Sequence, residues 1–503
     1  MMKLLTLIVI LIMHNNSLAN QQISNLITPM SYFINHVKQL NDLQRNLDKY
    51  KKASILGTSG TGKTQLARTY AYENRDKYNI IWFIDCNLDS NKEFVKLAKY
   101  INQETNANLS EDAEISKKEV MNYLSHQNQW LLVLDNLKIN ENRKIQDLID
   151  WEHNGNIVFC SQDSEALPHV IEITSFNQKD SVTLAGNLLD SADKNDITFL
   201  SQAFSGYPIL IVQGAQLLNK IKGLNKEEYK KKIYQSADKI KLNITLAIQE
   251  LKPSAVKLLA KIALINNQQF SKQLLRQITD DISSIEDDIY QLSKFMLIVN
   301  VKTNEDNPIF EMHDIIAQKV VEINGDKNNQ IYLEDIITKF ISFIPKGVVK
   351  SYVFREEETV RENLEIITKN AQKYNINIYI LMELNLQLII QYVNTLDLYN
   401  SRILVDWFNI NNEERKFKIR SMDNNVKAVY ARFLGMIGWY HRRCSDYTKA
   451  AEYYNKEIEV YNDVKGFEAS KCNAYFGSPS INVESLNHRN PCSIKESCIA
   501  FSI

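Results

Sequence analysis

One eight-residue window of the chain has the residue types and the spacing that bind phosphate. It matches the pattern G-x-x-x-x-G-K-[ST] with Gly57, Thr58, Ser59, Gly60, Thr61, Gly62, Lys63 and Thr64. Glycine permits a tight turn and lets inward-pointing backbone N–H groups approach an anion closely. A helix that starts after the last glycine would add its positive N-terminal end. We therefore predict a P-loop in which Lys63 contacts the β- and γ-phosphates and Thr64 binds Mg²⁺, with Gln65 among the nucleotide-binding residues. The alternative is a glycine-rich turn that binds no ligand.

A second candidate is the carboxylate that ends the apolar run Trp130–Asp135 (WLLVLD). Many buried strands end in Asp, but the position of this one after the P-loop favours the Walker B role, in which Asp135 orients Mg²⁺. Asn136 follows, where many hydrolysing P-loop proteins have a second acid. An amide cannot act as a general base at neutral pH. We therefore expect at most a slow ATPase, with Lys63 and Asp135 as the catalytic residues.

Short apolar runs alternate with helical patterns around these two motifs. The sequence predicts a helix at 63–74 and strands at 53–56, 79–85, 129–134, 156–160 and 170–174. Near-continuous apolar strands separated by helices indicate a parallel sheet that helices cover on both faces. We therefore predict an α/β P-loop NTPase domain, with Asp135 at the carboxyl edge of its sheet.

After residue 176 the predicted strands stop. Helices are predicted at 180–189 and 196–204, and Gly206-Tyr207-Pro208 interrupts the pattern before another helix from Ile209. Further along, helices and then a strand pair resemble a winged-helix domain; these elements are at 254–265, 271–278, 296–301 and 308–312. The rest of the chain to about residue 465 has a helical pattern. The predicted parts are a signal peptide at 1–19, a linker with a helix at 20–52, a P-loop domain at 53–175, a helical domain at 176–245, a winged-helix domain at 246–328, helical repeats at 329–465 and an irregular tail at 466–503.

Length and composition agree with several folded domains. The chain has 503 residues, of which 44% are hydrophobic and 24% charged, as in globular proteins. The net charge of −1 gives no support for a general nucleic-acid-binding surface. No pair of the six cysteines has zinc-ligand spacing. No stretch after the N-terminal run is apolar enough to cross a bilayer.

The N-terminus has the layout of a secretory signal peptide. Lys3 precedes an apolar run from Leu4 to Met13, and Ser17-Leu18-Ala19 provides a cleavage site. We therefore expect a secreted protein. Because ATP is expected in cytosol rather than in a periplasm or outside cells, a secreted P-loop protein suggests export by an intracellular bacterium into a host compartment that contains nucleotide. The alternative is a misplaced start codon, with translation from Met30 and a cytoplasmic protein.

Residues 33 to 325 resemble an NB-ARC domain of the STAND class of signalling NTPases. The P-loop and Asp135 occur in the family's order with three shorter motifs. The strand Asn156–Cys160 is similar to the family's sensor strand, although Gln162 stands where the family has an arginine that senses the γ-phosphate. Gly206-Tyr207-Pro208 matches the family's Gly-x-Pro, and Met312-His313-Asp314 matches its Met-His-Asp.

The resemblance implies a nucleotide switch with ADP bound at rest and ATP bound in the active state. It implies that Pro208 packs on the adenine, that His313 contacts the β-phosphate of ADP, and that Gln162 lies near the γ-phosphate. It also implies a P-loop domain, a helical domain and a winged helix, and makes a nucleotide-dependent homo-oligomer possible. Taken alone, Gly206-Tyr207-Pro208 is an ordinary turn between helices. Likewise, His313 or Asp314 could simply cap the following helix.

A tetratricopeptide-like pattern occurs near the C-terminus. Small residues at a predicted helix crossing and aromatic residues around it fit the pattern, namely Ile437, Gly438, Asp446, Tyr447, Ala450 and Tyr454. His441 and Glu457 depart from it. Repeats of this type stack and bind proteins, so we expect a protein partner there. An ordinary amphipathic helix pair is the alternative.

Three functions follow from these motifs. The first is the adenine-nucleotide switch, coupled to the helical repeats. The second is an interaction scaffold with a structural, non-hydrolysed nucleotide, which Asn136 and Gln162 favour. The third, a winged-helix transcription regulator, is weakened by the neutral charge balance and would require salt-sensitive DNA binding.

Overall fold

The computed structural model describes most of the chain. The described residues are 22–30, 34, 37–86, 90–110, 112–138, 151–163, 167–191, 193–221, 225–265, 267–302, 307–343, 363, 366–394, 398–414, 416–421, 423–462 and 464. The predicted signal peptide and irregular tail lie outside them. The chain divides into two compact units, Met1–Val256 with Glu286–Ile323 and Lys257–Ile285 with Asn324–Ile503. Within the described part, no helix is both long and apolar enough to cross a membrane.

The first unit contains a six-stranded sheet in the order β1-β3-β4-β5-β2-β6, with parallel neighbours. Its strands are β1 (Ile23–Ser24), β2 (Lys52–Leu56), β3 (Ile80–Asp85), β4 (Trp130–Leu137), β5 (Asn156–Ser161) and β6 (Val170–Glu172). The predicted parallel sheet is thereby confirmed. One strand, β5, separates the P-loop strand β2 from β4, which contains Asp135.

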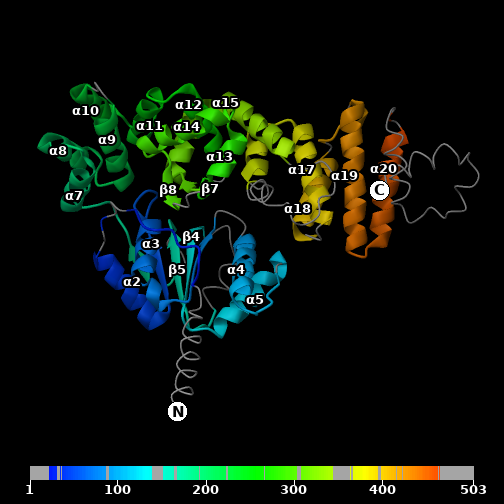
Figure 1. Ribbon diagram of the computed structural model, residues 1–503, viewed down its shortest axis with the longest axis horizontal. Coiled ribbons are helices and arrows are strands. Elements are labelled where there is room, and N and C mark those ends of the chain that lie inside the picture. Colours follow the sequence, from blue (N-terminus) through cyan, green and yellow to red (C-terminus); the bar gives the residue numbers. More distant parts are fainter. Residues whose placement is uncertain are drawn as a thin grey trace, which may run out of the picture. The chain divides into compact units, whose positions relative to one another are not determined.

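Helices cover both faces of the sheet, as the uninterrupted apolar strands require. They are α2 (Val37–Tyr50), α3 (Lys63–Glu73), α4 (Ser90–Glu104) and α5 (Ala113–Ser125) (Figure 1). In β4, Leu131 and Val133 pack with residues of α2 and α3. Leu132 and Leu134 pack with residues of α4 and α5. The alternation places an apolar core on each side of one strand.

The N-terminal segment belongs to the sheet. We expected residues 20–52 to be a linker and a helix, but Ile23–Ser24 pairs with β3 as an edge strand. Asn25 extends this pairing, because its Nδ2 donates to the Phe83 carbonyl at 2.9 Å and its Oδ1 accepts from the Phe83 N–H at 2.7 Å. Ile23 and Ile27 are buried. The sheet therefore starts well before residue 53.

Five helices follow the sheet in the same unit. They are α7 (Gln178–Leu188), α8 (Lys194–Ala203), α9 (Pro208–Lys220), α10 (Lys226–Gln235) and α11 (Lys239–Gln249). Side chains of Asn177, Asp193, Asn225 and Asp238 accept hydrogen bonds from backbone N–H groups of the first turns of α7, α8, α10 and α11. Such caps satisfy donors that a helix leaves unpaired. A side-chain cap therefore stabilises the first turn of each of these four helices in the predicted helical domain.

Helices and a strand pair come next, as the sequence indicated. They are α12 (Pro253–Ile262), β7 (Phe270–Ser271), α13 (Lys272–Ile278), α14 (Ile285–Lys294), β8 (Val299–Lys302) and β9 (Ile309–Glu311). Strands β8 and β9 are antiparallel. The winged-helix assignment of this segment stays a prediction.

The long helix α15 (Asp314–Phe343) contains a sharp break at Gly325. The Gly325 φ of 72° and ψ of 161° lie in a region of backbone conformation that essentially only glycine adopts. No atom lies within 4 Å of the position where a Cβ would stand. The glycine is therefore required by backbone conformation and not by crowding.

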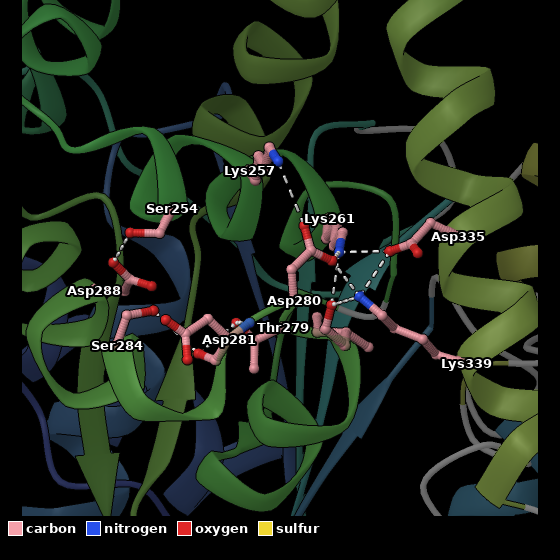
Figure 2. Close-up of polar contacts among 11 residues, drawn as sticks. Ser254, Lys257, Lys261, Thr279, Asp280, Asp281, Ser284, Asp288, Asp335 and Lys339 are labelled. Carbon is pink, nitrogen blue, oxygen red and sulfur yellow. Dashed lines mark hydrogen bonds and ion pairs between the residues drawn. The ribbon is translucent and has the colours of Figure 1, made fainter.

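A buried lysine holds part of the second unit together (Figure 2). The Lys261 ammonium on α12 donates to the Ile278 carbonyl at 2.8 Å and to Asp280 at 2.6 Å, and it pairs with Asp335 at 2.5 Å. Lys339 bonds the same two carboxylates. A buried charge is tolerated only when it is paired and hydrogen-bonded. These four side chains form a lysine–aspartate cluster, which consists of Lys261, Asp280, Asp335 and Lys339. The cluster joins α12, the turn after α13 and the C-terminal half of α15.

The C-terminal part of the second unit is helical. It contains α17 (Ile378–Asn394), α18 (Leu398–Glu413), α19 (Asn424–Arg443) and α20 (Tyr447–Asn462). Gly438 lets α19 and α20 approach, because a Cβ there would lie 2.9 Å from the Tyr454 ring. The helix pair occurs where the tetratricopeptide-like pattern placed it. Its repeat type stays a prediction.

Candidate functional site

Three glycines shape the turn between β2 and α3. Gly60 and Gly62 have φ values of 80° and 100°, the left-handed region that glycine adopts freely. A Cβ on Gly57 would stand 2.5 Å from the Ile173 carbonyl oxygen. The Thr61 hydroxyl donates to the Thr58 carbonyl at 2.8 Å and so fixes the middle of the loop around Ser59. These residues form the concave, backbone-lined turn that a phosphate needs.

Lys63 lies in this turn with its ammonium against the loop. Its Nζ donates to the carbonyls of Gly57 and Thr58 at 2.8 and 3.0 Å. Burial lowers the pKa of Lys63, and the negative charge of Asp135 opposes that effect. A phosphate would offer this ammonium a charged acceptor, which makes a stronger hydrogen bond than a carbonyl does. The lysine is therefore placed for an anion in the loop.

Thr64 and Asp135 meet at the carboxyl edge of the sheet. The Thr64 hydroxyl donates to Asp135 Oδ2 at 2.8 Å. Burial raises the pKa of Asp135, while the hydrogen bond from Thr64 and the Arg68 charge lower it. Hydroxyl and carboxylate oxygens are ligands that Mg²⁺ accepts, and it keeps waters and phosphate oxygens in its other positions. The pair thus fits a magnesium ion, which would neutralise phosphate charge.

A further acid lies beside this pair and was missed by sequence reasoning. Asp85 ends β3 in register with Asp135 of β4. Its Oδ1 accepts a hydrogen bond from Asn136 Nδ2 at 3.1 Å. Asp85 ends an apolar run as Asp135 does, and this shared pattern is the signal that could have identified it.

The Gly206-Tyr207-Pro208 segment lies against Phe176, which follows β6, and Ile209 after it lies beside the P-loop. Gly206 has a φ of 74°, and a Cβ there would stand 2.0 Å from the Phe176 carbonyl oxygen. Its own carbonyl accepts from the Phe176 N–H at 2.8 Å. Pro208 begins α9, and the Ile209 side chain is 3.1 Å from the Cβ position of Gly60. Pro208 therefore immediately precedes Ile209, whose side chain lies beside the phosphate-binding turn.

The segment around His313 also lies beside the P-loop helix. Arg68 of α3 pairs with Glu311 of β9 at 2.8 Å, and both side chains are nearly buried. His313 Nδ1 accepts from the Ile315 N–H at 3.2 Å, so the imidazole caps α15, as one sequence alternative suggested. Burial lowers the pKa of His313; the charges of Asp314 and Glu311 oppose this shift, and those of Lys63 and Arg68 add to it. The imidazole therefore lies near both acidic and cationic side chains. The Arg68–Glu311 pair was not expected from sequence.

Two other predicted nucleotide-binding residues, Gln162 and Gln65, do not form any of the contacts described so far. Gln162 follows β5 and is exposed. The Gln65 side chain turns to the N-terminal segment, where its Oε1 accepts from the Met30 N–H at 3.1 Å. The structure thus groups Lys63, Thr64 and Asp135 with the His313 segment.

Comparisons with known proteins do not assign this chain to a family. No protein-family model and no curated protein matches the chain. One similar solved structure is a signal transduction ATPase with numerous domains and a tetratricopeptide repeat sensor from Pyrococcus horikoshii, with 13% identity, a TM-score of 0.43, and coverage of 94% of this chain and 78% of that one. Another is a Walker-type ATPase of Pyrococcus abyssi, with 16% identity, a TM-score of 0.32, and coverage of 58% and 97%.

Proposed function

We propose that the protein is an adenine-nucleotide-binding regulatory switch of the STAND type, with ADP bound at rest and ATP bound in the active state. The observation that carries this proposal is the grouping of the Thr64–Asp135 pair and Lys63 beside the His313 segment. The P-loop, with Thr58, Ser59 and Gln65, would hold the phosphates, and Pro208 would pack on the adenine. His313 would contact the β-phosphate from the other side, and Mg²⁺ would bind Thr64 and Asp135.

The charges around His313 give the switch a direction. Lys63 and Arg68 are the cations near the imidazole, while Glu311 and Asp314 are acidic. A γ-phosphate adds negative charge near this acidic segment, so ATP would favour the closed arrangement less than ADP does. A ligand shifts a two-state equilibrium only through such a difference in affinity. The Arg68–Glu311 pair would hold the closed state.

The helical C-terminal region would transmit the change to a protein partner. Helices α17 to α20 belong to the second unit and contribute no residue to the site described above. Binding of a partner, or of further copies of the chain, to these helices would depend on the nucleotide state.

The test is the identity of the nucleotide that copurifies with residues 21–503. Protein purified without added nucleotide is denatured, and the released nucleotide is separated by chromatography. About one ADP per chain is expected. Lys63→Ala should lose it, because the ammonium that contacts the phosphates is gone. Full nucleotide occupancy in Lys63→Ala, or a wild-type site that binds neither added ADP nor ATP, would refute the P-loop assignment.

A scaffold with a structural nucleotide is the second candidate. The exposed Gln162 amide favours it, because that position would otherwise supply a cation near the γ-phosphate. Bound ADP that neither exchanges with labelled ADP nor is replaced by ATP would support the scaffold over the switch.

Cleavage after Ala19 and delivery into a nucleotide-containing host compartment are part of the proposal. Such cleavage would keep β1, which begins at Ile23. Mass spectrometry of the protein from its native source is expected to find a chain that starts at Asn20. An intact Met1 or Met2 would instead support the cytoplasmic alternative.

A further inference from the structure

Two carboxylates lie near the carboxyl ends of neighbouring strands of the sheet, and the P-loop accounts for only one of them. Asp85 of β3 and Asp135 of β4 are paired in register. Side chains of in-register residues on parallel strands point to the same face, so Asp85 points to the face on which Asp135 meets Thr64. Asp135 is buried, whereas Asp85 is half-buried. Asp85 is therefore next to the predicted magnesium site without being needed for the Thr64 contact.

Asn136 connects the two acids through an unusual backbone. Its φ of 58° is left-handed, and the pairing of β4 with β5 shifts between Leu134 and Leu137. Irregularities of this kind re-aim a side chain and occur often beside active sites. The Asn136 N–H donates to Asp135 Oδ1 at 2.9 Å, and Nδ2 donates to Asp85 Oδ1 at 3.1 Å. Because the amide nitrogen faces Asp85, the amide oxygen faces away from it.

We infer that Asp85 is a positioning residue that orients the Asn136 amide, and that the amide oxygen aligns the attacking water in ATP hydrolysis. This inference rests on the proposed nucleotide binding. An amide side chain aligns the attacking water in other P-loop enzymes without taking its proton. The missing second acid after Asp135 is thereby replaced by an amide that a neighbouring strand holds in place.

The reaction needs no protein base. The water oxygen forms a bond to the γ-phosphorus, while the bond from that phosphorus to the β–γ bridging oxygen breaks. The electron pair of the broken bond stays on ADP. One water proton moves to a γ-phosphate oxygen, so the products are ADP and dihydrogen phosphate.

The test separates orientation from proton transfer. In Asp85→Asn, an amide oxygen can accept the same hydrogen bond from Asn136 but cannot take a proton at neutral pH. This variant should therefore keep kcat within about threefold of wild type, whereas Asp85→Ala and Asn136→Ala should lower kcat about tenfold or more. All three should bind a non-hydrolysable ATP analogue with the wild-type Kd. Glu172→Ala is the matched control, because Glu172 is an exposed carboxylate at the end of β6.

Each other result has a defined meaning. Equal loss of turnover in Asp85→Asn and Asp85→Ala would make the carboxylate itself the base and overturn the positioning role. Wild-type turnover in Asp85→Ala would remove Asp85 from the reaction. Wild-type protein that binds the analogue but never hydrolyses ATP would overturn this inference and leave the nucleotide switch intact. Protein that binds no nucleotide would overturn both.

Discussion

Gly206, between α8 and α9, packs against the segment that connects β6 to α7, and this contact requires a residue without a side chain. Its carbonyl and the Phe176 backbone form a hydrogen bond, while its Cβ position is occupied by the Phe176 carbonyl. The residue therefore fixes the approach of Pro208 and α9 to the P-loop through backbone atoms alone.

Gly206→Ala should destabilise the first unit by about 2 kcal/mol or more, because alanine at positive φ is strained and the new methyl group meets a backbone oxygen. Urea unfolding monitored by circular dichroism measures the change. Gly186→Ala is the control, since Gly186 lies in α7 with no atom closer than 3.9 Å to its Cβ position. That variant should be neutral or about 0.5–1 kcal/mol more stable. Equal stability of the two variants would contradict the strain at Gly206.

Glu457 is a buried acid between α19 and α20. Burial raises its pKa to about 8, and the Arg432 charge opposes the shift. The acid stands where the tetratricopeptide pattern has a small residue, and it packs against Gly435 of α19. At neutral pH the folded helix pair therefore holds a proton that the unfolded chain has already released.

The stability of this helix pair should fall as pH rises. Because the pKa of Glu457 is higher in the folded than in the unfolded chain, the stabilisation is complete below the ordinary pKa of 4.5 and lost as pH rises through about 8. The slope approaches about 1.4 kcal/mol per pH unit in that window. Glu457→Gln should remove it and be more stable than wild type at pH 8. Urea titrations at pH 5.5 and 8 test this, with the exposed Glu452→Gln as control. An identical pH slope in wild type and Glu457→Gln would contradict the buried proton.

Residues of the candidate site could be predicted from the sequence only where they belong to a recognisable local motif. Lys63 and Thr64 belong to a contiguous motif, and Asp135 ends a recognisable apolar strand. Arg68 and Glu311 have no such pattern, since their pairing depends on how β9 packs against α3. Asp85 also ends an apolar run, but that run does not reveal its register with Asp135, which places the two acids side by side.

Among the elements, β1 is short but contributes buried surface. Its residues follow the predicted cleavage site and precede Met30, so the two possible N-termini differ by this strand. The apolar runs of the other strands were long enough to be predicted close to their observed bounds. A two-residue edge strand has no periodicity and could not be predicted in this way.

A chain that starts at Met30 should be less stable than one that starts at Asn20. The shorter chain loses the buried side chains of Ile23 and Ile27, each worth about 1.5–3 kcal/mol, and the Asn25 hydrogen bonds to Phe83. Thermal unfolding of the two purified chains compares them directly. Equal midpoints would mean that β1 contributes little to the fold.

For the whole molecule, the key prediction concerns release of ADP. His313→Ala should release bound ADP about tenfold faster, because it removes the proposed imidazole contact to the β-phosphate. His313→Asn separates this effect from helix capping, since Asn can still accept the Ile315 N–H. It should release ADP as fast as His313→Ala. Stopped-flow displacement of a fluorescent ADP analogue gives the rates, with the exposed His126→Ala as control. Wild-type release from His313→Asn would mean that His313 only caps α15.

The lysine–aspartate cluster constrains which sequences can share this fold. Replacing Asp280 or Asp335 alone leaves the buried Lys261 ammonium short of a counter-charge, which costs far more than an exposed ion pair is worth. Replacing all the charged members by apolar residues of similar volume can be nearly neutral. Divergence at these positions should therefore be concerted. Among homologues, Lys261, Asp280 and Asp335 should be conserved together or substituted together, whereas substitutions of the exposed Lys257 should occur independently of them.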